Sequence, residues 1–173
     1  GYDYVYLLNQ DAWVMPDTFE KLIEAQLKNP RFGIISPLQL QANMQHLDTN
    51  FNLLCGRCTG LLDDLVLGEL QDIYEVPVVM AAHWLISKEC LRKVGGFSPT
   101  FPHYGEDDNY ANRTQYHGFS IGIMPQAKAV HDRENRTVSE EHQIYREYIG
   151  YLIMFSEIFH PKSHQCVRMF GLC

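Results

Sequence analysis

Basic residues are scarce in this chain of 173 residues: 14 Lys and Arg stand against 21 Asp and Glu, which gives a formal net charge of −7. Proteins that bind nucleic acid through the phosphate backbone carry a basic excess, so this balance argues against a nucleic-acid partner. The sequence also lacks an uninterrupted apolar run long enough to span a bilayer. With 46% apolar and 20% charged residues, its composition is that of one globular domain with a substantial core.

Cysteine occurs only five times, an odd number at irregular spacings. Cys55 and Cys58 form one C-x-x-C motif, which occurs in redox pairs and in halves of zinc sites. No second C-x-x-C and no histidine pair at zinc-finger spacing follows it, and no thioredoxin-like βαβ pattern surrounds it. We therefore expect free thiols in a reducing cytosol, with a redox or metal role as the alternative.

The first part of the chain predicts a strand, a helix and a second strand. Residues 4–8 form a β-rich apolar run, Pro16-Asp17 open a helix, Asn29-Pro30 end it, and residues 32–36 return as a strand. A strand–helix–strand of this length indicates a βαβ unit with a parallel, right-handed crossover.

Strands and helices continue to alternate in the rest of the chain. Residues 41–72 show no sustained period, and we expect a long excursion over one face there. Beyond them the patterns predict a strand or two within 76–86, helices at 87–94 and 106–117, strands at 119–123 and near 128–131, and a long amphipathic helix from 139 to about 159. The expected apolar stripe of that last helix consists of Ile144, Tyr148, Tyr151, Leu152 and Phe155.

Acidic and imidazole side chains gather in three places. Asn9-Gln10-Asp11 follow the first strand, Glu106-Asp107-Asp108 open a helix, and His131-Asp132 follow the last strand. The carboxyl ends of strands are where open α/β sheets place ligand chemistry. Carboxylate oxygens with one imidazole suit Mg²⁺ or Mn²⁺, and a further carboxylate can accept a proton from a hydroxyl. Each cluster alone also has a structural explanation, because a helix dipole supports acids at its start and a lone histidine is commonly structural.

Two runs of this sequence resemble the family 2 glycosyltransferases, which have the GT-A fold, and among them the rhamnosyltransferase-like enzymes. The run DYVYLLNQDAWVMPDTFEKLI (3–23) resembles the family's acidic metal-binding motif and following helix. The run from AAHWLI to AVHD (81–132) resembles its second signature, in which a strand of small residues leads to a helix, GGF, an acidic motif opening a helix, and a strand ending in His. The likeness covers roughly residues 1–135.

The resemblance implies an α/β, GT-A-like fold with a mixed, mainly parallel sheet flanked by helices. Residues 1–135 would be the catalytic and acceptor-side part, and residues 136–173 a C-terminal helical extension. In the family the nucleotide-binding half precedes the metal motif, which stands almost at position 1 here. We therefore expect this chain to lack that half.

The resemblance also implies roles at single positions. Asp11 would bind the metal, and Asn9 would contact the donor in place of the motif's first acid. His131 would complete the protein's metal ligands. Asp107 would be the catalytic base, with Glu106 beside it orienting the acceptor or tuning the base.

Three further residues are candidates for the acceptor side. Trp84 could stack on a sugar ring, with a place in the core as the alternative explanation. Tyr104, just before the acidic motif, would form a wall of the acceptor site. Arg113 resembles an arginine often found after the acidic motif and would brace it. Asp108 and Asn109 depart from the family pattern, which leaves the acceptor open.

The function that the resemblance implies is inverting, metal-dependent transfer of a sugar from a nucleotide-diphosphate sugar to a glycan or lipid-linked acceptor hydroxyl. The cofactor would be Mn²⁺ or Mg²⁺. The expected setting is bacterial surface-polysaccharide synthesis in the cytoplasm, with peripheral association of the full-length protein at the inner face of the membrane. The alternatives are a non-catalytic carbohydrate-binding or interaction module, and a metal-dependent phosphohydrolase. The latter would need a second metal cluster or a phosphate-binding Gly loop, and the sequence shows neither.

Overall fold

The computed structural model describes residues 1–56, 58–102, 104–133 and 140–156. Their strands are β1 (Tyr4–Leu8), β2 (Ala12–Val14), β3 (Phe32–Leu40), β4 (Tyr74–Val76), β5 (His83–Ser87) and β6 (Ser120–His131). Their helices are α1 (Thr18–Lys28), α2 (Thr49–Cys55), α3 (Leu61–Leu67), α4 (Lys88–Val94), α5 (Glu106–Tyr116) and α6 (Glu140–Ser156). The predicted end of the last helix near residue 159, and residues 136–139 and 157–173 of the predicted extension, lie outside the described part. No helix within it is both long and apolar enough to cross a membrane.

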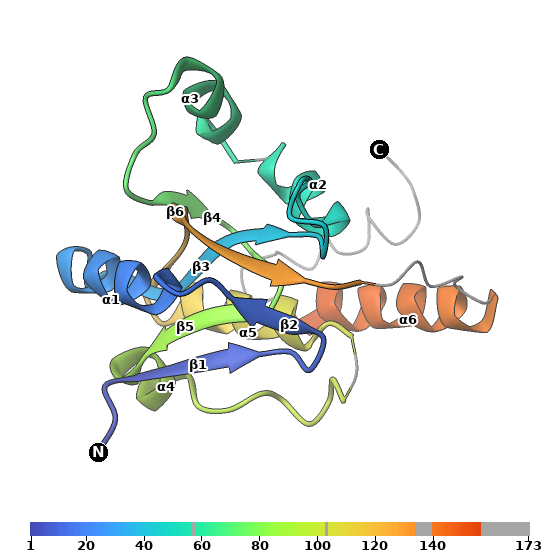
Figure 1. Cartoon of the computed structure of the whole chain (residues 1–173). Helices are drawn as coiled ribbons and strands as arrows, with labels where there is room; N and C mark the ends of the chain where they lie inside the picture. The colour runs from blue at the N-terminus through green and yellow to red at the C-terminus, as the bar shows by residue number, and fades with distance from the viewer. Residues whose placement is uncertain (57, 103, 134–139, 157–173) are drawn as a thin grey trace.

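The strands form one six-stranded sheet in the order β1-β5-β3-β6-β2, in which β4 pairs with the first part of β6 and β2 with its end (Figure 1). Helix α1 lies on one face of the sheet, while α4 and α5 lie on the other (Figure 1). This mixed sheet flanked by helices confirms the predicted fold class. The expectation that parallel pairing predominates was wrong, because β3 with β6 is the one parallel ladder among the described strands.

The predicted βαβ unit is present in altered form. Strands β1 and β3 run in the same direction, but β5 lies between them and is antiparallel to both. The crossover through α1 therefore skips one position in the sheet. The skipped position is filled by β5 from later in the chain, and this insertion brings its amino end beside the carboxyl end of β1, where Leu8 pairs with His83.

The last strand was predicted as two separate strands, but the structure has one. β6 is one strand of 12 residues, with an irregularity where its register against β3 jumps from Met124 to Lys128. Pro125 lies in this jump, and proline cannot donate a ladder hydrogen bond, so strands accommodate it at bulges. The predicted gap between the two strands therefore coincides with this irregularity, but β6 continues through it to His131.

The segment 41–72, predicted as a long excursion over one face, contains two short helices, α2 and α3, that were not predicted. Both lie above the sheet in Figure 1. Each has seven residues, too few to show a helical period. Cys58, between the two helices, is a buried free thiol, and burial raises the pKa of that thiol.

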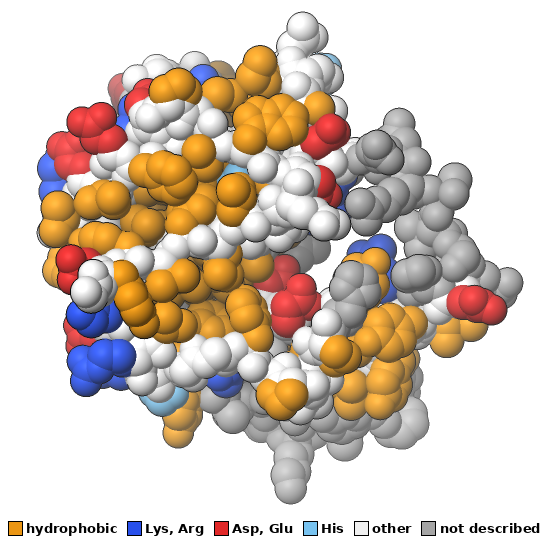
Figure 2. Space-filling view, turned by 60° about the horizontal axis from the view of Figure 1, so that its bottom comes forward, with side chains coloured by type: hydrophobic (Ala, Val, Ile, Leu, Met, Phe, Trp, Pro, Cys, Tyr) orange, Lys and Arg blue, Asp and Glu red, His pale blue; other side chains and the backbone are white. Residues whose placement is uncertain are grey.

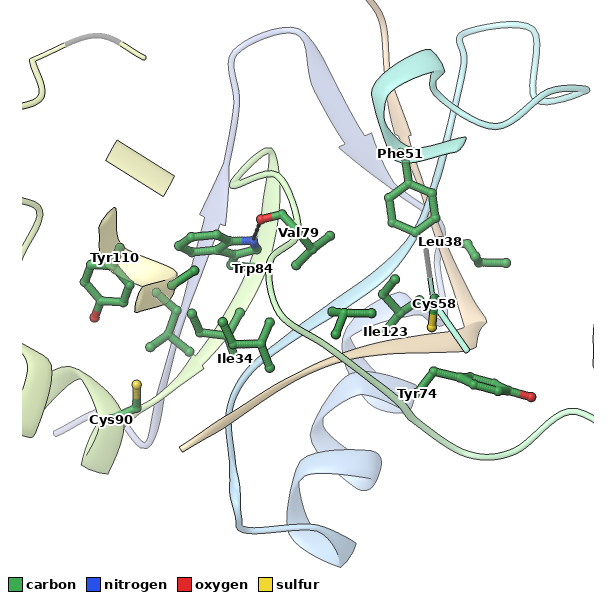
Figure 3. Close-up of a cluster of buried hydrophobic side chains, with 14 of the residues drawn as sticks. Ile34, Leu38, Phe51, Cys58, Tyr74, Val79, Trp84, Cys90, Tyr110 and Ile123 are labelled. Atoms are coloured by element: carbon green, nitrogen blue, oxygen red, sulfur yellow. Dashed lines mark hydrogen bonds between the residues drawn. The ribbon is translucent and has the colours of Figure 1, made fainter. Parts of the chain in front are cut away.

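The larger core cluster lies between the sheet and helices α2 to α5 (Figure 3). Trp84 of β5 is fully buried there, and its indole Nε1 donates a hydrogen bond of 3.1 Å to the carbonyl of Val79. Tyr110 of α5 lies beside it, with the ring centroids 5.9 Å apart. A second cluster beneath α1 contains Leu22 and Leu85 on the opposite face.

Helix α6 packs on α5 through a different face from the predicted stripe. Ile149 is buried, whereas Ile144, Tyr148 and Tyr151 are exposed. The predicted stripe is thus wrong at these three positions, and the side chain of Phe155 lies outside the described part. The buried face contacts Gly105, where an added Cβ would lie 2.7 Å from side-chain carbons of both Ile149 and Ile153.

Candidate active site

Asp11 lies in the tight connection between β1 and β2. The amide of Asn9 donates to the carbonyl of Ala82 (3.2 Å), and the amide of Ala12 donates back to the carbonyl of Asn9 (3.2 Å). The unpredicted strand β2 then pairs antiparallel with the end of β6, so that Ala12 stands opposite His131. This pairing brings Asp11 Oδ1 to 3.6 Å from His131 Nε2.

Asp107 lies in the first turn of α5. Residue Gly105, with φ of 76°, precedes the helix and offers no side-chain cap. Asp107 Oδ1 accepts a hydrogen bond of 2.9 Å from the amide of Asp108, and the backbone amide of Ala81 also bonds to this carboxylate. The carboxylate is therefore held at the positive end of the helix dipole, which favours negative charge.

The segment Ala81-Ala82 joins these two places. Its first residue bonds to the carboxylate of Asp107, and its second accepts the hydrogen bond from Asn9. The carboxyl ends of β1 and β6 and the amino ends of β5 and α5 therefore meet at one edge of the sheet. Seen from the side of β1, the surface shows acidic side chains in a hollow beside a broad apolar area (Figure 2).

Two site residues were missed by the sequence analysis. Asp48 is 1% exposed, and its Oδ2 lies 3.6 Å from His131 Nδ1 and 3.2 Å from Arg133 Nε. Arg133 Nε also donates a hydrogen bond of 3.3 Å to His131 Nδ1. The sequence held one usable signal: Asp48 precedes a helix start as an N-cap residue would, but α2 was itself not predicted.

His83 supports the same corner from within the sheet. Its Nε2 lies 2.9 Å from the carbonyl of Val130, and its Nδ1 lies 3.0 Å from the hydroxyl of Tyr6. A carbonyl can only accept, so Nε2 carries the ring proton and Nδ1 accepts from the tyrosine. Burial lowers the pKa of His83, which favours this neutral form. His83 thereby fixes the end of β6 just before His131.

The three acceptor-side candidates, Trp84, Tyr104 and Arg113, differ in burial and in what they contact. Trp84 is fully buried, so its ring cannot face a sugar, and we remove it from the candidate site. The guanidinium of Arg113 donates to the carbonyls of Val94 (2.9 Å) and Gly96 (2.7 Å), so Arg113 ties α5 to the end of α4. Tyr104 is half-buried, with φ of 64°, next to the acidic motif.

The donor atoms of Asp11 and His131 fit a divalent cation. Adjacent ligands of an octahedral ion lie about 3 Å apart, so the observed 3.6 Å between Oδ1 and Nε2 needs only a small adjustment. A hard carboxylate oxygen with one imidazole suits Mn²⁺. The described residues contain no group of three or more His, Cys, Asp or Glu arranged to hold a metal ion. Among the described residues, the site thus offers two protein ligands, and a bound molecule or water could supply others.

Burial raises the pKa of Asp107, and the amides of Asp108, Asp107 and Ala81 and the charge of Arg133 oppose this only in part. Ionised Asp107 thus costs folding stability above its folded-state pKa, and this cost disappears as the pH falls through that pKa. We expect Asp107→Asn to raise the melting temperature at pH 7, and the gain to vanish in acid. Differential scanning fluorimetry between pH 3 and 8 measures this.

The matched control is Asp17→Asn. Asp17 is exposed, and its hydrogen bond to Lys21, which lies 2.6 Å away, lowers the pKa of its carboxyl. Its replacement should not raise the melting temperature at pH 7. A lower melting temperature for Asp107→Asn than for the wild type at pH 7 would contradict the assigned environment of Asp107.

The comparisons with known proteins identify the fold. The sequence matches no protein-family model and no curated protein. Among solved structures, the chain is similar to the mannosyltransferase PcManGT from Pyrobaculum calidifontis in complex with GDP-Man and Mn²⁺, with a TM-score of 0.58 and 18% identity over 92% of this chain. It is also similar to GalNAc-T7 with UDP, GalNAc and Mn²⁺, with a TM-score of 0.56 and 12% identity over 85% of this chain.

These likenesses establish a GT-A-like fold. The chain spans 40% of the length of the mannosyltransferase and 31% of the length of GalNAc-T7. At such identities the fold is shared, while activity and substrates of this chain need their own evidence.

Proposed function

We propose that this chain carries the catalytic and acceptor-side part of an inverting, metal-dependent family 2 glycosyltransferase, similar to rhamnosyltransferases. The observation that carries the proposal is the meeting of the Asp11–His131 pair and Asp107 at the segment Ala81-Ala82, on a GT-A-like fold. Structures of that fold with UDP and with GDP-Man, each with Mn²⁺, support a nucleotide-sugar donor and Mn²⁺ as the cation. The acceptor would be a glycan or lipid-linked hydroxyl.

Two separate acidic places are what the chemistry requires. In an inverting transfer the acceptor oxygen attacks the anomeric carbon from the face opposite the leaving diphosphate. Asp107 would accept the proton of the attacking hydroxyl, and its raised pKa makes it a better base than an ordinary carboxylate. Asp11 and His131 would hold the cation, which stabilises the charge on the diphosphate when bound. Asn9 is exposed beside Asp11 and would contact the donor.

Metal binding tests this proposal directly. Because Asp11 and His131 are the two protein ligands that the described residues offer, we expect weak or no binding of Mn²⁺ alone. In the presence of UDP or GDP, whose phosphates complete the coordination, Mn²⁺ should bind more tightly. Isothermal titration calorimetry with each nucleotide, and with none, measures the difference.

Asp11→Asn provides the control, since it should weaken Mn²⁺ binding in the presence of the nucleotide without unfolding the chain. Asp63→Asn changes the same charge on the distant, exposed surface of α3 and should have no effect. Tight binding of Mn²⁺ without nucleotide, or equal binding by wild type and Asp11→Asn, would overturn the metal assignment.

A further inference from the structure

Asp48 is the N-cap residue of α2 and caps the helix with one of its two carboxylate oxygens. Its Oδ1 accepts hydrogen bonds from the amides of Asn50 and Phe51, each 3.0 Å long, at the start of α2. Such a cap satisfies backbone donors that the helix leaves unpaired. Capping alone would account for an aspartate here, but it employs only one of the two oxygens.

The second oxygen faces the candidate active site. Asp48 Oδ2 lies 3.6 Å from His131 Nδ1 and 3.2 Å from Arg133 Nε. On the other side of the same imidazole, Nε2 lies 3.6 Å from Asp11 Oδ1. The His131 ring therefore stands between two carboxylates, one half-exposed in the site and one buried behind it.

We infer that Asp48 is a positioning residue that orients His131 toward the cation, an inference that rests on the proposed function. A histidine that binds a metal through one ring nitrogen must carry its proton on the other, and that N–H is normally held by a carboxylate, a carbonyl or water. In this structure Nδ1 accepts a hydrogen bond of 3.3 Å from Arg133 Nε. A cation bound at Nε2 would require the ring proton to lie on Nδ1 instead, where Asp48 Oδ2, 3.6 Å away, is the facing carboxylate.

Arg133 balances the buried charge of this arrangement. A buried carboxylate is costly unless it is paired and hydrogen-bonded. Asp48 has two amide donors on Oδ1 and the guanidinium of Arg133 at Oδ2, so its charge is compensated without a proton from His131. Asp48 thus connects the start of α2 with His131, the last residue of β6, and with Arg133 just beyond that strand.

A serine at position 48 separates positioning from capping. Serine caps helices about as well as aspartate, but it has a single oxygen and cannot also reach His131. We expect Asp48→Ser to melt close to the wild-type temperature and to bind Mn²⁺ about 10–100-fold more weakly in the presence of UDP or GDP, the loss typical of a removed supporting hydrogen bond. Electron paramagnetic resonance of free Mn²⁺ measures this affinity, and His131→Ala gives the limit for a lost ligand.

A second measurement needs no metal. The ¹⁵N signals of the His131 ring, identified by their absence in His131→Gln, should shift in Asp48→Ser, because Asp48 Oδ2 faces Nδ1 and also holds Arg133 Nε, which donates to Nδ1. A residue that only capped α2 would leave these signals in place. Unchanged ring signals, or unchanged Mn²⁺ affinity in Asp48→Ser while the wild type binds, would overturn the inference. Failure of the wild type to bind Mn²⁺ with either nucleotide would instead count against the proposed function, and the ring signals would still decide whether Asp48 holds His131.

Discussion

Asp107→Asn is expected to lower kcat by about 10²–10⁴-fold, the usual contribution of a general base. The amide keeps the size and shape of the carboxylate but cannot accept the proton of an attacking hydroxyl. Donor affinity should change little, because the proposed cation site at Asp11 and His131 lies on the other side of the segment Ala81-Ala82. Steady-state kinetics with the nucleotide sugar that the wild-type protein turns over measure both quantities.

Asp108→Asn is the matched control for this substitution. It removes the same charge at the start of the same helix, one residue along, so a general effect of the acidic helix start would appear in both variants. Asp11→Asn should behave in a third way and weaken cation and donor binding together with turnover. If Asp107→Asn retained kcat within a few-fold of the wild type, Glu106 would be the next candidate for the base.

Trp84→Ala is expected to lower the free energy of unfolding by about 3–5 kcal/mol, the cost of removing a large buried aromatic. The indole of Trp84 is fully buried between β5 and α5, and its loss also leaves the carbonyl of Val79 without that donor. Since domains of this size have only about 5–15 kcal/mol of stability, the variant should be marginally folded. Urea denaturation followed by circular dichroism measures the change.

Trp13→Ala is the control, because Trp13 is the other tryptophan of the chain and is 43% exposed on β2. Its removal should cost far less stability. A similar loss in the free energy of unfolding for both variants would contradict the assignment of Trp84 to the core. The comparison also bears on the acceptor, since a tryptophan that bound sugar would affect acceptor KM more than stability.

Elements with strong local signals were predictable from the sequence. Ser87 caps α4 by accepting from the amide of Cys90, and Gly95 ends that helix with φ of 80°, as the residue types indicated. The acidic start of α5 and the apolar run of β1 were equally visible, although β1 lies at the edge of the sheet and is only partly buried. In each case the chemistry that decides the structure lies within a few residues of the element itself.

Features that depend on distant pairing were not predictable in this way. Strand β2 has three residues and exists through its pairing with the end of β6, more than a hundred positions later. The place of β5 between β1 and β3 likewise follows from the whole sheet. Asp48 was missed for the same reason, because only the folded chain brings it to His131.

The acidic motif begins after a turn with left-handed backbone at Tyr104 and Gly105. Helix α6, which starts more than 30 residues later in the chain, packs against this turn. Gly105 is covered by Ile149 and Ile153 of α6 so closely that a side chain at this position would force them to shift. The start of α5, which carries Glu106 and Asp107, is therefore packed directly against α6. Truncating the chain after residue 135 would uncover the turn that aims Glu106 and Asp107. Helix α6 thus supports the start of α5 through direct packing, and a change in α6 would be felt at the acidic motif.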